Sequence, residues 1–364
     1  MEKLHFEFMM TRPIEARISL DALSKNLSRV RDFAPGSAVL SVIKANAYGH
    51  GLLPVASALS GSEGFALLEL GEALKLRQAG YRQKIVLLEG FFSADELPEI
   101  SAYEIDIVIH CKEQLDLLCS ENLPKPVGVF LKFNSGMNRL GFDRNGFYAA
   151  LERLRGSVNV SGIVPMTHFP AADLDAGIAS EMREMEAVLH GLSFPSSLAN
   201  SASLIRYPET RTGWVRPGIM LYGASPFPET SAAELGLTPV MTLASRIIAV
   251  QDLKPGAGVG YGPLFRADRP MRVGVAACGY ADGYPRHAPN GTPVLVGGKR
   301  SRTIGRVSMD MLYVDLSGID DAGIGTEVVL WGEGLPAEEV AHACGTISYE
   351  LFCARAPRVP VSYY

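Results

Sequence analysis

One stretch of the sequence decides how the fold is interpreted: Val39-Leu40-Ser41-Val42-Ile43-Lys44-Ala45-Asn46-Ala47-Tyr48-Gly49-His50-Gly51. Its short apolar run predicts a buried strand, which two glycines then break. Lys44 is therefore expected at the C-terminal end of a strand, facing a loop. Apolar neighbours disfavour an ammonium, so we expect a lowered pKa and an amine available to form a Schiff base. The alternative is a lysine that extends its stem from the strand end into solvent.

Apolar runs alternate with helical patterns at nearly constant intervals after this stretch. The runs cover residues 38–43, 65–70, 84–88, 105–110, 127–133, 160–167, 197–200 and 215–222. The helical patterns cover residues 71–79, 93–100, 112–119, 145–154 and 175–189. Such βα units predict a parallel sheet, and eight of them fit a (β/α)8 TIM-type barrel. An open doubly wound sheet is the alternative, but no GxGxxG follows the first run.

The pattern changes after Pro226-Phe227-Pro228, where short β-rich runs are separated by glycine and proline turns. Strands are predicted over residues 242–250, 271–277, 293–296, 301–304, 311–316 and 327–330. We therefore predict an α/β barrel domain over residues 12–235 and a β-rich barrel or sandwich domain over residues 236–364. Residues 1–20 are candidates to join the second domain, and Met1 and Met10 are both candidate start positions.

Composition narrows the class of protein. The 364 residues are 47% hydrophobic, which is enough for two cores, and the net charge of −5 offers no basic surface to nucleic acid or to an anionic membrane. The first ten residues lack the apolar region of a signal peptide, and no run approaches the ~20 apolar residues of a membrane span. Five cysteines without CxxC spacing predict reduced thiols and no metal site. We expect a cytoplasmic protein that acts on small molecules.

Candidate site residues follow the barrel runs at the ends where catalytic groups of such barrels lie. They are Lys44, Arg139, His168, Asn200, Ser201, Arg216, Gly218 and Ile219. Taken singly, a residue such as His168 is more often a core histidine, one such as Ser201 more often a helix cap and one such as Arg139 more often a surface guanidinium. Their gathering at one face favours an active site, in which Ser201 and the amides of Gly218 and Ile219 are suited to a phosphate.

The second domain contributes Tyr261, in a glycine-rich turn. A tyrosine titrates near pH 10, so it can act as a general base only beside a positive group or hydrogen-bond donors. Turn packing is the alternative for this side chain.

In order along the chain, these motifs resemble the alanine racemase family, pyridoxal-phosphate enzymes of fold type III. The matching motifs are the Lys44–Gly51 segment, Gly136-Met137-Asn138-Arg139-Leu140-Gly141, Val215-Arg216-Pro217-Gly218-Ile219-Met220-Leu221-Tyr222-Gly223, Val259-Gly260-Tyr261-Gly262, Gly279-Tyr280-Ala281-Asp282-Gly283 and Gly305-Arg306-Val307-Ser308-Met309-Asp310-Met311. The resemblance covers essentially the whole chain beyond the first ten or so residues.

The resemblance implies a homodimer that interconverts L-alanine and D-alanine with two bases. Lys44 would carry pyridoxal 5'-phosphate and exchange the proton on the D-alanine side, and Tyr261 from the other subunit would act on the L-alanine side. The implied cofactor-binding residues are Lys44, Tyr48, Leu88, His168, Asn200, Ser201, Arg216, Gly218, Ile219 and Tyr349. The implied substrate-binding residues are Arg139 and Met309, and Tyr280, Arg306 and Asp310 would narrow the passage into the site.

Arg216 would face the pyridine nitrogen of the cofactor and leave that nitrogen unprotonated, because an arginine cannot be deprotonated in a protein. A structural salt bridge is the alternative for Arg216. Lys132 corresponds to a lysine that is often carbamylated in the family. Here Asn134 stands where the family more often has aspartate, so the modification of Lys132 is left open, and Ser308 stands where some members have cysteine.

The implied role is the supply of D-alanine for peptidoglycan or the catabolism of L-alanine. Two alternatives remain. One is a related racemase for serine or a broader set of amino acids, although export signals and paired cysteines, usual in broad-specificity members, are not evident. The other is a pyridoxal-phosphate carrier protein on the same kind of barrel, a class that lacks the β-rich domain and therefore Tyr261.

Overall fold

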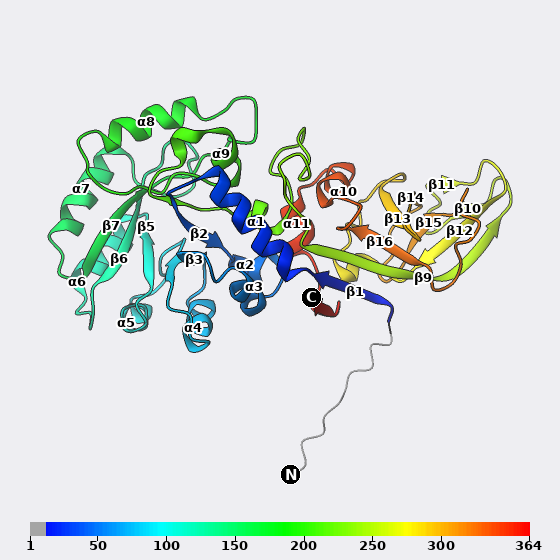
Figure 1. Ribbon diagram of the computed structural model, residues 1–364, viewed down its shortest axis with the longest axis horizontal. Helices are drawn as coiled ribbons and strands as arrows, with labels where there is room; N and C mark the ends of the chain where they lie inside the picture. Colours follow the sequence, from blue (N-terminus) through cyan, green and yellow to red (C-terminus); the bar gives the residue numbers. More distant parts are fainter. Residues whose placement is uncertain (1–11) are drawn as a thin grey trace, which may run out of the picture. The chain divides into compact units, whose positions relative to one another are not determined.

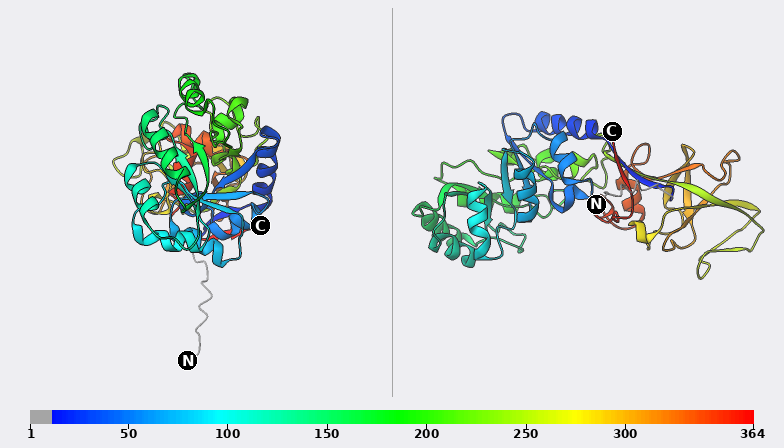
Figure 2. Two further views of the ribbon diagram at one scale, coloured as in Figure 1. Left: turned by 90° about the vertical axis from the view of Figure 1, so that its left-hand side faces the viewer. Right: turned by 90° about the horizontal axis from the view of Figure 1, so that it is seen from below.

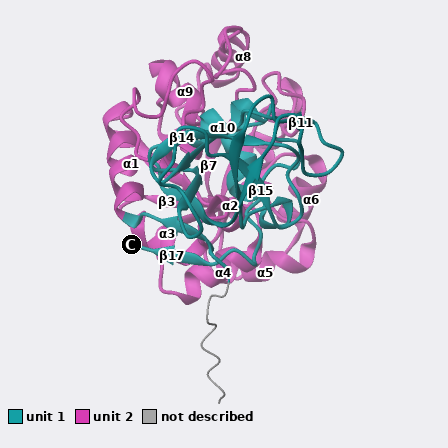
Figure 3. Ribbon diagram, turned by 90° about the vertical axis from the view of Figure 1, so that its right-hand side faces the viewer, with its two compact units in different colours: residues 1–20, 239–364 teal, residues 21–238 magenta. Residues whose placement is uncertain are grey.

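The computed structural model describes residues 12–364, so the predictions for the first ten residues lie outside the described part of the chain. The chain divides into two compact units (Figure 3). The first unit, drawn in magenta and marked unit 2 in the key of that figure, comprises Asp21–Thr238, and the second unit, drawn in teal and marked unit 1, comprises Pro239–Tyr364 with residues 12–20. The functional division into domains 12–235 and 236–364 stays a prediction. None of the helices in the described residues is long and apolar enough to cross a membrane.

The first unit is built on a parallel sheet with the order β7-β6-β5-β4-β3-β2-β8 (Figure 1). Its strands are β2 (Ala38–Val42), β3 (Gly64–Leu67), β4 (Lys84–Leu87), β5 (Asp106–Ile109), β6 (Val127–Lys132), β7 (Val160–Met166) and β8 (Trp214–Val215). Ser197 forms parallel bridges to both Met166 and Trp214, so a single residue joins β7 to β8. This arrangement confirms the TIM-type barrel.

Helices surround this sheet, as the end-on view of the unit in Figure 2 shows. They are α1 (Leu20–Phe33), α2 (Lys44–Tyr48), α3 (Leu52–Ala58), α4 (Leu70–Gln78), η1 (Ala94–Glu96), α5 (Leu97–Ala102), α6 (Lys112–Ser120), α7 (Arg144–Arg155), α8 (Ala179–Leu189), α9 (Ser201–Arg206), η2 (Pro208–Thr210) and η3 (Ile219–Tyr222). Strands β3 to β6 are almost entirely buried, because helices and the barrel interior cover both faces of the sheet, whereas β7 exposes Ser161 and Gly162 near its start.

Three local predictions for the barrel were wrong. The run 215–222 is a strand only at Trp214–Val215, because Pro217 and Gly218 interrupt it and η3 follows. The run 197–200 keeps a single bridge at Ser197. Lys44 does not end a strand, since β2 stops at Val42 and a short helical turn begins at Lys44. All three lie at the edge of the sheet where the predicted site residues gather.

The second unit is a mainly antiparallel sheet with the order β12-β15-β14-β13-β16-β9-β1-β17. The bounds are β1 (Ile14–Ile18), β9 (Met241–Leu253), β10 (Gly258–Val259), β11 (Phe265–Arg266), β12 (Met271–Ala276), η4 (Tyr280–Asp282), β13 (Pro293–Val296), β14 (Lys299–Ile304), β15 (Leu312–Asp315), β16 (Glu327–Trp331), α10 (Ala337–Ala343), α11 (Ser348–Cys353) and β17 (Val361–Tyr363). The long strand β9 also pairs with β12, which closes the sheet into a barrel. A β-rich second fold is thus confirmed.

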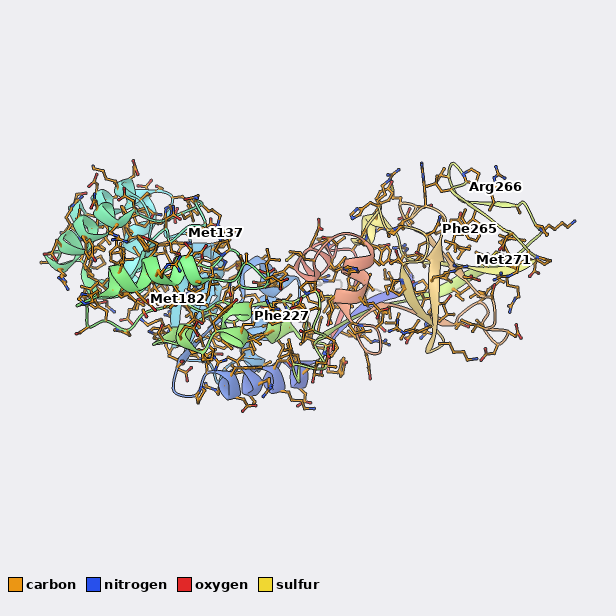
Figure 4. All side chains as sticks on the ribbon, turned by 90° about the horizontal axis from the view of Figure 1, so that it is seen from above. Met137, Met182, Phe227, Phe265, Arg266 and Met271 are labelled. Atoms are coloured by element: carbon orange, nitrogen blue, oxygen red, sulfur yellow. The ribbon has the colours of Figure 1, made fainter. Side chains whose placement is uncertain are left out.

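A hydrophobic cluster anchors the hairpin of β10 and β11. Val259, Ala267, Met271, Val273 and Ile304 are buried together, and Phe265 packs against them; Figure 4 labels Phe265 and Met271. The base of the hairpin is therefore fixed by burial of apolar surface, while its tip, which carries a predicted catalytic residue, projects from this base.

Candidate active site

The turn that begins at Lys44 has a left-handed backbone, opposite in hand to an ordinary α-helix. Ala45, Asn46, Ala47 and Tyr48 all have φ between +51° and +54°, which makes one turn of left-handed helix without a glycine. A left-handed conformation costs roughly 1–2 kcal/mol for each ordinary residue. Such backbone persists only where the surroundings enforce it, and it gathers at functional sites. The sequence carries almost no signal for it, because only Asn46 is a residue type that tolerates this conformation.

The turn brings Tyr48 against Gly218. A Cβ placed on Gly218 would lie 2.7 Å from Oη of Tyr48, so any larger residue there would displace the Tyr48 hydroxyl. The amide of Gly218 donates to Oγ of Ser201 over 2.8 Å. Two hydroxyls and a backbone amide thus meet in one cradle, built from residues far apart in the sequence. Hydroxyl and amide groups gathered in this way suit a phosphate group.

Arg216 is fixed beside this cradle in the barrel. Its Nη1 donates to the carbonyl and the hydroxyl of Ser197 over 2.7 and 2.8 Å, and its Nη2 donates to the carbonyl of Thr167 over 2.7 Å. Burial lowers its pKa to about 10, so the guanidinium is still charged at neutral pH. These acceptors are uncharged, which argues against the alternative of a structural salt bridge. The site receives a fixed positive charge.

Lys132, Arg139 and His168 line one small pocket. Burial, with the nearby charges of Arg216 and Arg139, lowers the pKa of Lys132 to about 8. Burial and the charges of Arg216 and Lys132 lower the pKa of His168 to about 3, so this imidazole is neutral at physiological pH. The end of the barrel therefore concentrates positive charge on lysine and arginine side chains, which suits anionic groups such as phosphate or carboxylate.

The remaining barrel residues of the predicted site cap a helix, pair with neighbouring backbone or pack in the core. Asn200 is the N-cap of α9 and forms a capping box with Ser203, so the helix cap is Asn200 and not Ser201. Leu88 directly follows β4 and donates its amide to Leu67. Ile219 is fully buried at the start of η3. Asn134 accepts from the amides of Gly136 and Asn138 and so shapes the loop that leads to Arg139.

Tyr261 lies at the tip of the β10–β11 hairpin in the second unit. Its side chain is 74% exposed, and Gly260 and Gly262 on either side have φ of +67° and +54°. A Cβ on Gly262 would lie 3.6 Å from Nη1 of Arg306, so that arginine lies along the hairpin. An exposed phenol on an anchored hairpin argues against the alternative of turn packing.

Two loops of the second unit carry Tyr280, Met309 and Asp310. The amide of Tyr280 donates to the carbonyl of Ser308, and that of Ala281 donates to the carbonyl of Met309, each over 3.0 Å. Tyr280 and Met309 are 39% and 53% exposed. Tyr349 lies on α11, partly buried. The predicted substrate and passage residues of this unit are thus grouped on two loops that hold each other.

Asp282 fixes both loops, and sequence reasoning missed it. Its side chain is fully buried, where it accepts from Arg12 over 2.5 Å, from Arg358 over 2.8 Å and from the amide of Gly279 over 2.9 Å. Arg12 and Arg358 also bind Asp310. Burial opposes ionisation of Asp282, but these donors outweigh it and lower its pKa.

Within residues 12–364, no three His, Cys, Asp or Glu side chains are grouped as a metal site requires.

Comparisons with known proteins cover both units. Residues 18–226 match the family described as "Alanine racemase, N-terminal domain", and residues 240–363 match "Alanine racemase, C-terminal domain". The chain is 57% identical to an alanine racemase of Nitrosospira multiformis, over 96% of this chain and 99% of the relative. It is 54% identical to an alanine racemase of Nitrosomonas eutropha, with the same coverage.

Solved structures give the same picture. The biosynthetic alanine racemase from Pseudomonas aeruginosa is 44% identical and superposes with a TM-score of 0.95, over 97% of this chain and 99% of that one. Alanine racemase from Acinetobacter baumannii is 36% identical with a TM-score of 0.91, over 97% and 100% of the two chains. A TIM-type barrel with this cradle and a β-barrel unit therefore define an enzyme of the isomerase class. More specifically, the chain belongs to the alanine racemase family.

Proposed function

We propose that the protein interconverts L-alanine and D-alanine with pyridoxal 5'-phosphate as its cofactor. The single observation that carries this proposal is the cradle of Tyr48, Ser201 and Gly218, in which Tyr48 lies on the same short turn as Lys44 and meets Gly218 and Ser201 from two other elements. When bound, the cofactor supplies an electron sink that makes the α-hydrogen of an amino acid acidic. The residues of the chain then decide where that proton goes.

Lys44 binds the cofactor covalently through its amine. In the cradle, Tyr48, Ser201, Gly218 and Ile219 hold the phosphate, and their donors match its oxygens. On the family resemblance, Leu88, His168, Asn200 and Tyr349 make further contacts to the cofactor. Arg216 donates to the ring nitrogen and keeps it unprotonated, because a guanidinium gives up no proton at neutral pH.

Two bases on opposite faces invert the stereocentre. Lys44 exchanges the proton of D-alanine, and Tyr261 of the partner subunit exchanges the proton of L-alanine. The exposure of the Tyr261 side chain fits a residue that completes the active site of the other subunit in a homodimer. His168 stays neutral beside the ring and helps to tune Tyr261. Either base alone would return the proton to the face from which it came.

The substrate carboxylate is held by Arg139 and by the amide of Met309. Tyr280, Arg306 and Asp310 narrow the passage into the site. The backbone hydrogen bonds between the two loops of the second unit set their positions. The reaction takes place in the cytoplasm and supplies D-alanine for peptidoglycan or L-alanine for catabolism.

Lys132 is the candidate site of carbamylation, which the asparagine at position 134 leaves open. Its pKa of about 8 leaves a useful fraction of neutral amine at physiological pH, and only the neutral amine adds carbon dioxide, with release of a proton. The carbamate would carry a negative charge beside Arg139 and orient it. The carbonyl signal of a carbamate in carbon-13 NMR of the folded protein in labelled bicarbonate buffer tests this, with Lys132→Ala as the control that must lack the signal.

A racemisation assay over a panel of amino acids tests the proposed function. Alanine should be the preferred substrate; preference for serine or many amino acids would favour a broader racemase, and no turnover with bound cofactor would favour a carrier protein. Lys44→Ala should lose the visible absorption band of the bound cofactor. Tyr261→Phe should impair proton exchange from L-alanine far more than from D-alanine, and equal losses would contradict the two-base scheme.

A further inference from the structure

The left-handed turn after Lys44 is held by a small set of side chains. Oε1 of Glu72 accepts from the amide of Asn46 over 3.1 Å, and Oδ1 of Asn46 accepts from the amide of Leu52 over 2.9 Å. These bonds fix the middle and the exit of the turn. The last left-handed residue, Tyr48, needs a further restraint, because its ring must lie against Gly218.

His50 supplies that restraint from the C-terminal side. Its side chain is fully buried, and Nδ1 lies 2.8 Å from the carbonyl oxygen of Tyr48 and 3.2 Å from that of Ala47. A carbonyl oxygen can only accept, so Nδ1 carries the hydrogen and donates it. The His50 side chain thus binds the carbonyl oxygens of two left-handed residues, Ala47 and Tyr48. A right-handed turn would point these carbonyls in other directions.

An aromatic ring links His50 to the cradle. Tyr222 stacks on Tyr48 with ring centroids 4.6 Å apart, and its ring contacts that of His50 in a tilted arrangement with centroids 4.7 Å apart. The hydroxyl of Tyr222 donates to the carbonyl of Val42, at the end of β2, over 2.9 Å. Tyr222 also ends η3, the element that begins at Ile219 beside Gly218. His50 therefore contacts the turn through its backbone and through this shared ring.

We propose that His50 is a positioning residue for cofactor binding, which holds the left-handed turn so that the hydroxyl of Tyr48 stays in the cradle with Ser201 and Gly218. The inference rests on the proposed function, because it gives the cradle a phosphate to bind. His50 is not among the residues assigned to the cofactor or the substrate, and its contacts are with the backbone of the turn and with the ring of Tyr222. Its contribution is the Nδ1 donor, which is distinct from the space that its ring fills.

Three substitutions separate the donor from the ring. His50→Asn places a side-chain N–H close to the position of Nδ1, His50→Gln places one close to Nε2, and His50→Phe keeps a ring without a donor. His190, an exposed residue after α8, supplies the matched control His190→Asn. All variants are made in the full chain.

The first measurement is the dissociation constant of pyridoxal 5'-phosphate from each cofactor-stripped variant. We expect His50→Phe and His50→Gln to raise it about tenfold, which corresponds to ~1.4 kcal/mol, and His50→Asn to stay within about threefold of the parent protein. Equal affinity in His50→Phe and the parent would overturn the inference, as would equal weakening in His50→Asn and His50→Phe. A parent protein that binds no pyridoxal 5'-phosphate would contradict the proposed function instead.

The second measurement needs no cofactor. The amides of Gly49 and His50 donate to the carbonyls of Ala45 and Ala47 within the turn, over 3.0 Å each. In the cofactor-stripped protein, hydrogen exchange at these amides should accelerate at least fivefold in His50→Phe and stay near the parent rate in His50→Asn. Unchanged exchange in His50→Phe would show that the turn holds without this donor and would overturn the inference, even if the variant binds the cofactor poorly.

Discussion

The two units fix irregular backbone in opposite ways. In the barrel unit, the left-handed turn of residues 44–48 is held mostly by uncharged donors and stacked rings, with His50 and Tyr222 at its centre. In the second unit, the loops around Tyr280 and Met309 are held by a buried carboxylate, Asp282, between two arginines. The first arrangement depends on shape and on single hydrogen bonds. The second depends on charge balance, so the two should respond differently to substitution and to pH.

Removing both cations from Asp282 should have the largest effect on stability. In the double variant Arg12→Ala with Arg358→Ala, the carboxylate stays buried with only the amide of Gly279 as a donor. An uncompensated buried charge costs ~3–5 kcal/mol, which urea unfolding at pH 7 should detect. Adding Asp282→Asn to the double variant removes the charge and should restore much of the loss. A triple variant as unstable as the double variant would show that the arginines matter by packing alone.

The pH dependence sharpens the same comparison. The folded-state pKa of Asp282 is lowered, so its stabilising contribution is present above the unfolded value of about 3.9 and is lost as pH falls through the folded value. In the double variant, burial without the arginines raises that pKa, so acidification relieves the penalty. The difference in unfolding free energy between parent and double variant should therefore begin to shrink above about pH 4, as pH falls through the raised pKa of the double variant, and shrink further below about 4, where the parent loses its own stabilisation. A difference that stays constant would contradict the charge argument.

Gly279→Ala should come next, with a loss of roughly 1–3 kcal/mol from overpacking. A Cβ at this position would lie 2.3 Å from the carbonyl oxygen of Ser308, and backbone cannot rotate away as a side chain can. Gly323→Ala in the same unit is the control, since its Cβ would meet nothing within 4 Å. Thermal unfolding of the two variants tests this, and equal midpoints would mean that the two loops separate easily.

The architecture could be predicted from the sequence, because alternating apolar runs and helical patterns are local in the chain. The turn at Lys44 could not, since Ala45, Ala47 and Tyr48 are residue types that ordinarily avoid a positive φ. Nor could the role of Asp282, because Arg12 lies 270 residues away and nothing local marks the pairing. Motif resemblance named Tyr280 and Met309 from their own segments, but the carboxylate that joins the two loops becomes visible only in three dimensions.

Gly218→Ala should leave the fold intact and weaken cofactor binding, unlike Gly279→Ala. Its Cβ would meet the hydroxyl of Tyr48, the far end of a side chain that can rotate away. The cradle would then lose one donor and some of its space, so we expect the dissociation constant of pyridoxal 5'-phosphate to rise about tenfold, or ~1.4 kcal/mol. Gly162→Ala, which meets nothing within 4 Å, is the matched control. A larger loss of thermal stability than of affinity would reverse this distinction between the two regions.

Tyr222→Phe should give the smallest effect, because it removes one hydrogen bond and keeps the stacked rings. The lost bond runs from the hydroxyl to the carbonyl of Val42 in a buried setting, so unfolding should become easier by about 1 kcal/mol. Tyr103→Phe, on a ring that is 41% exposed, should change stability by less than half of that. Affinity for pyridoxal 5'-phosphate should stay within about threefold of the parent, because Tyr48 and His50 still pack against the phenylalanine. If affinity instead falls tenfold, the turn is held mainly through the anchoring of Tyr222 to β2, and the restraint from His50 is secondary.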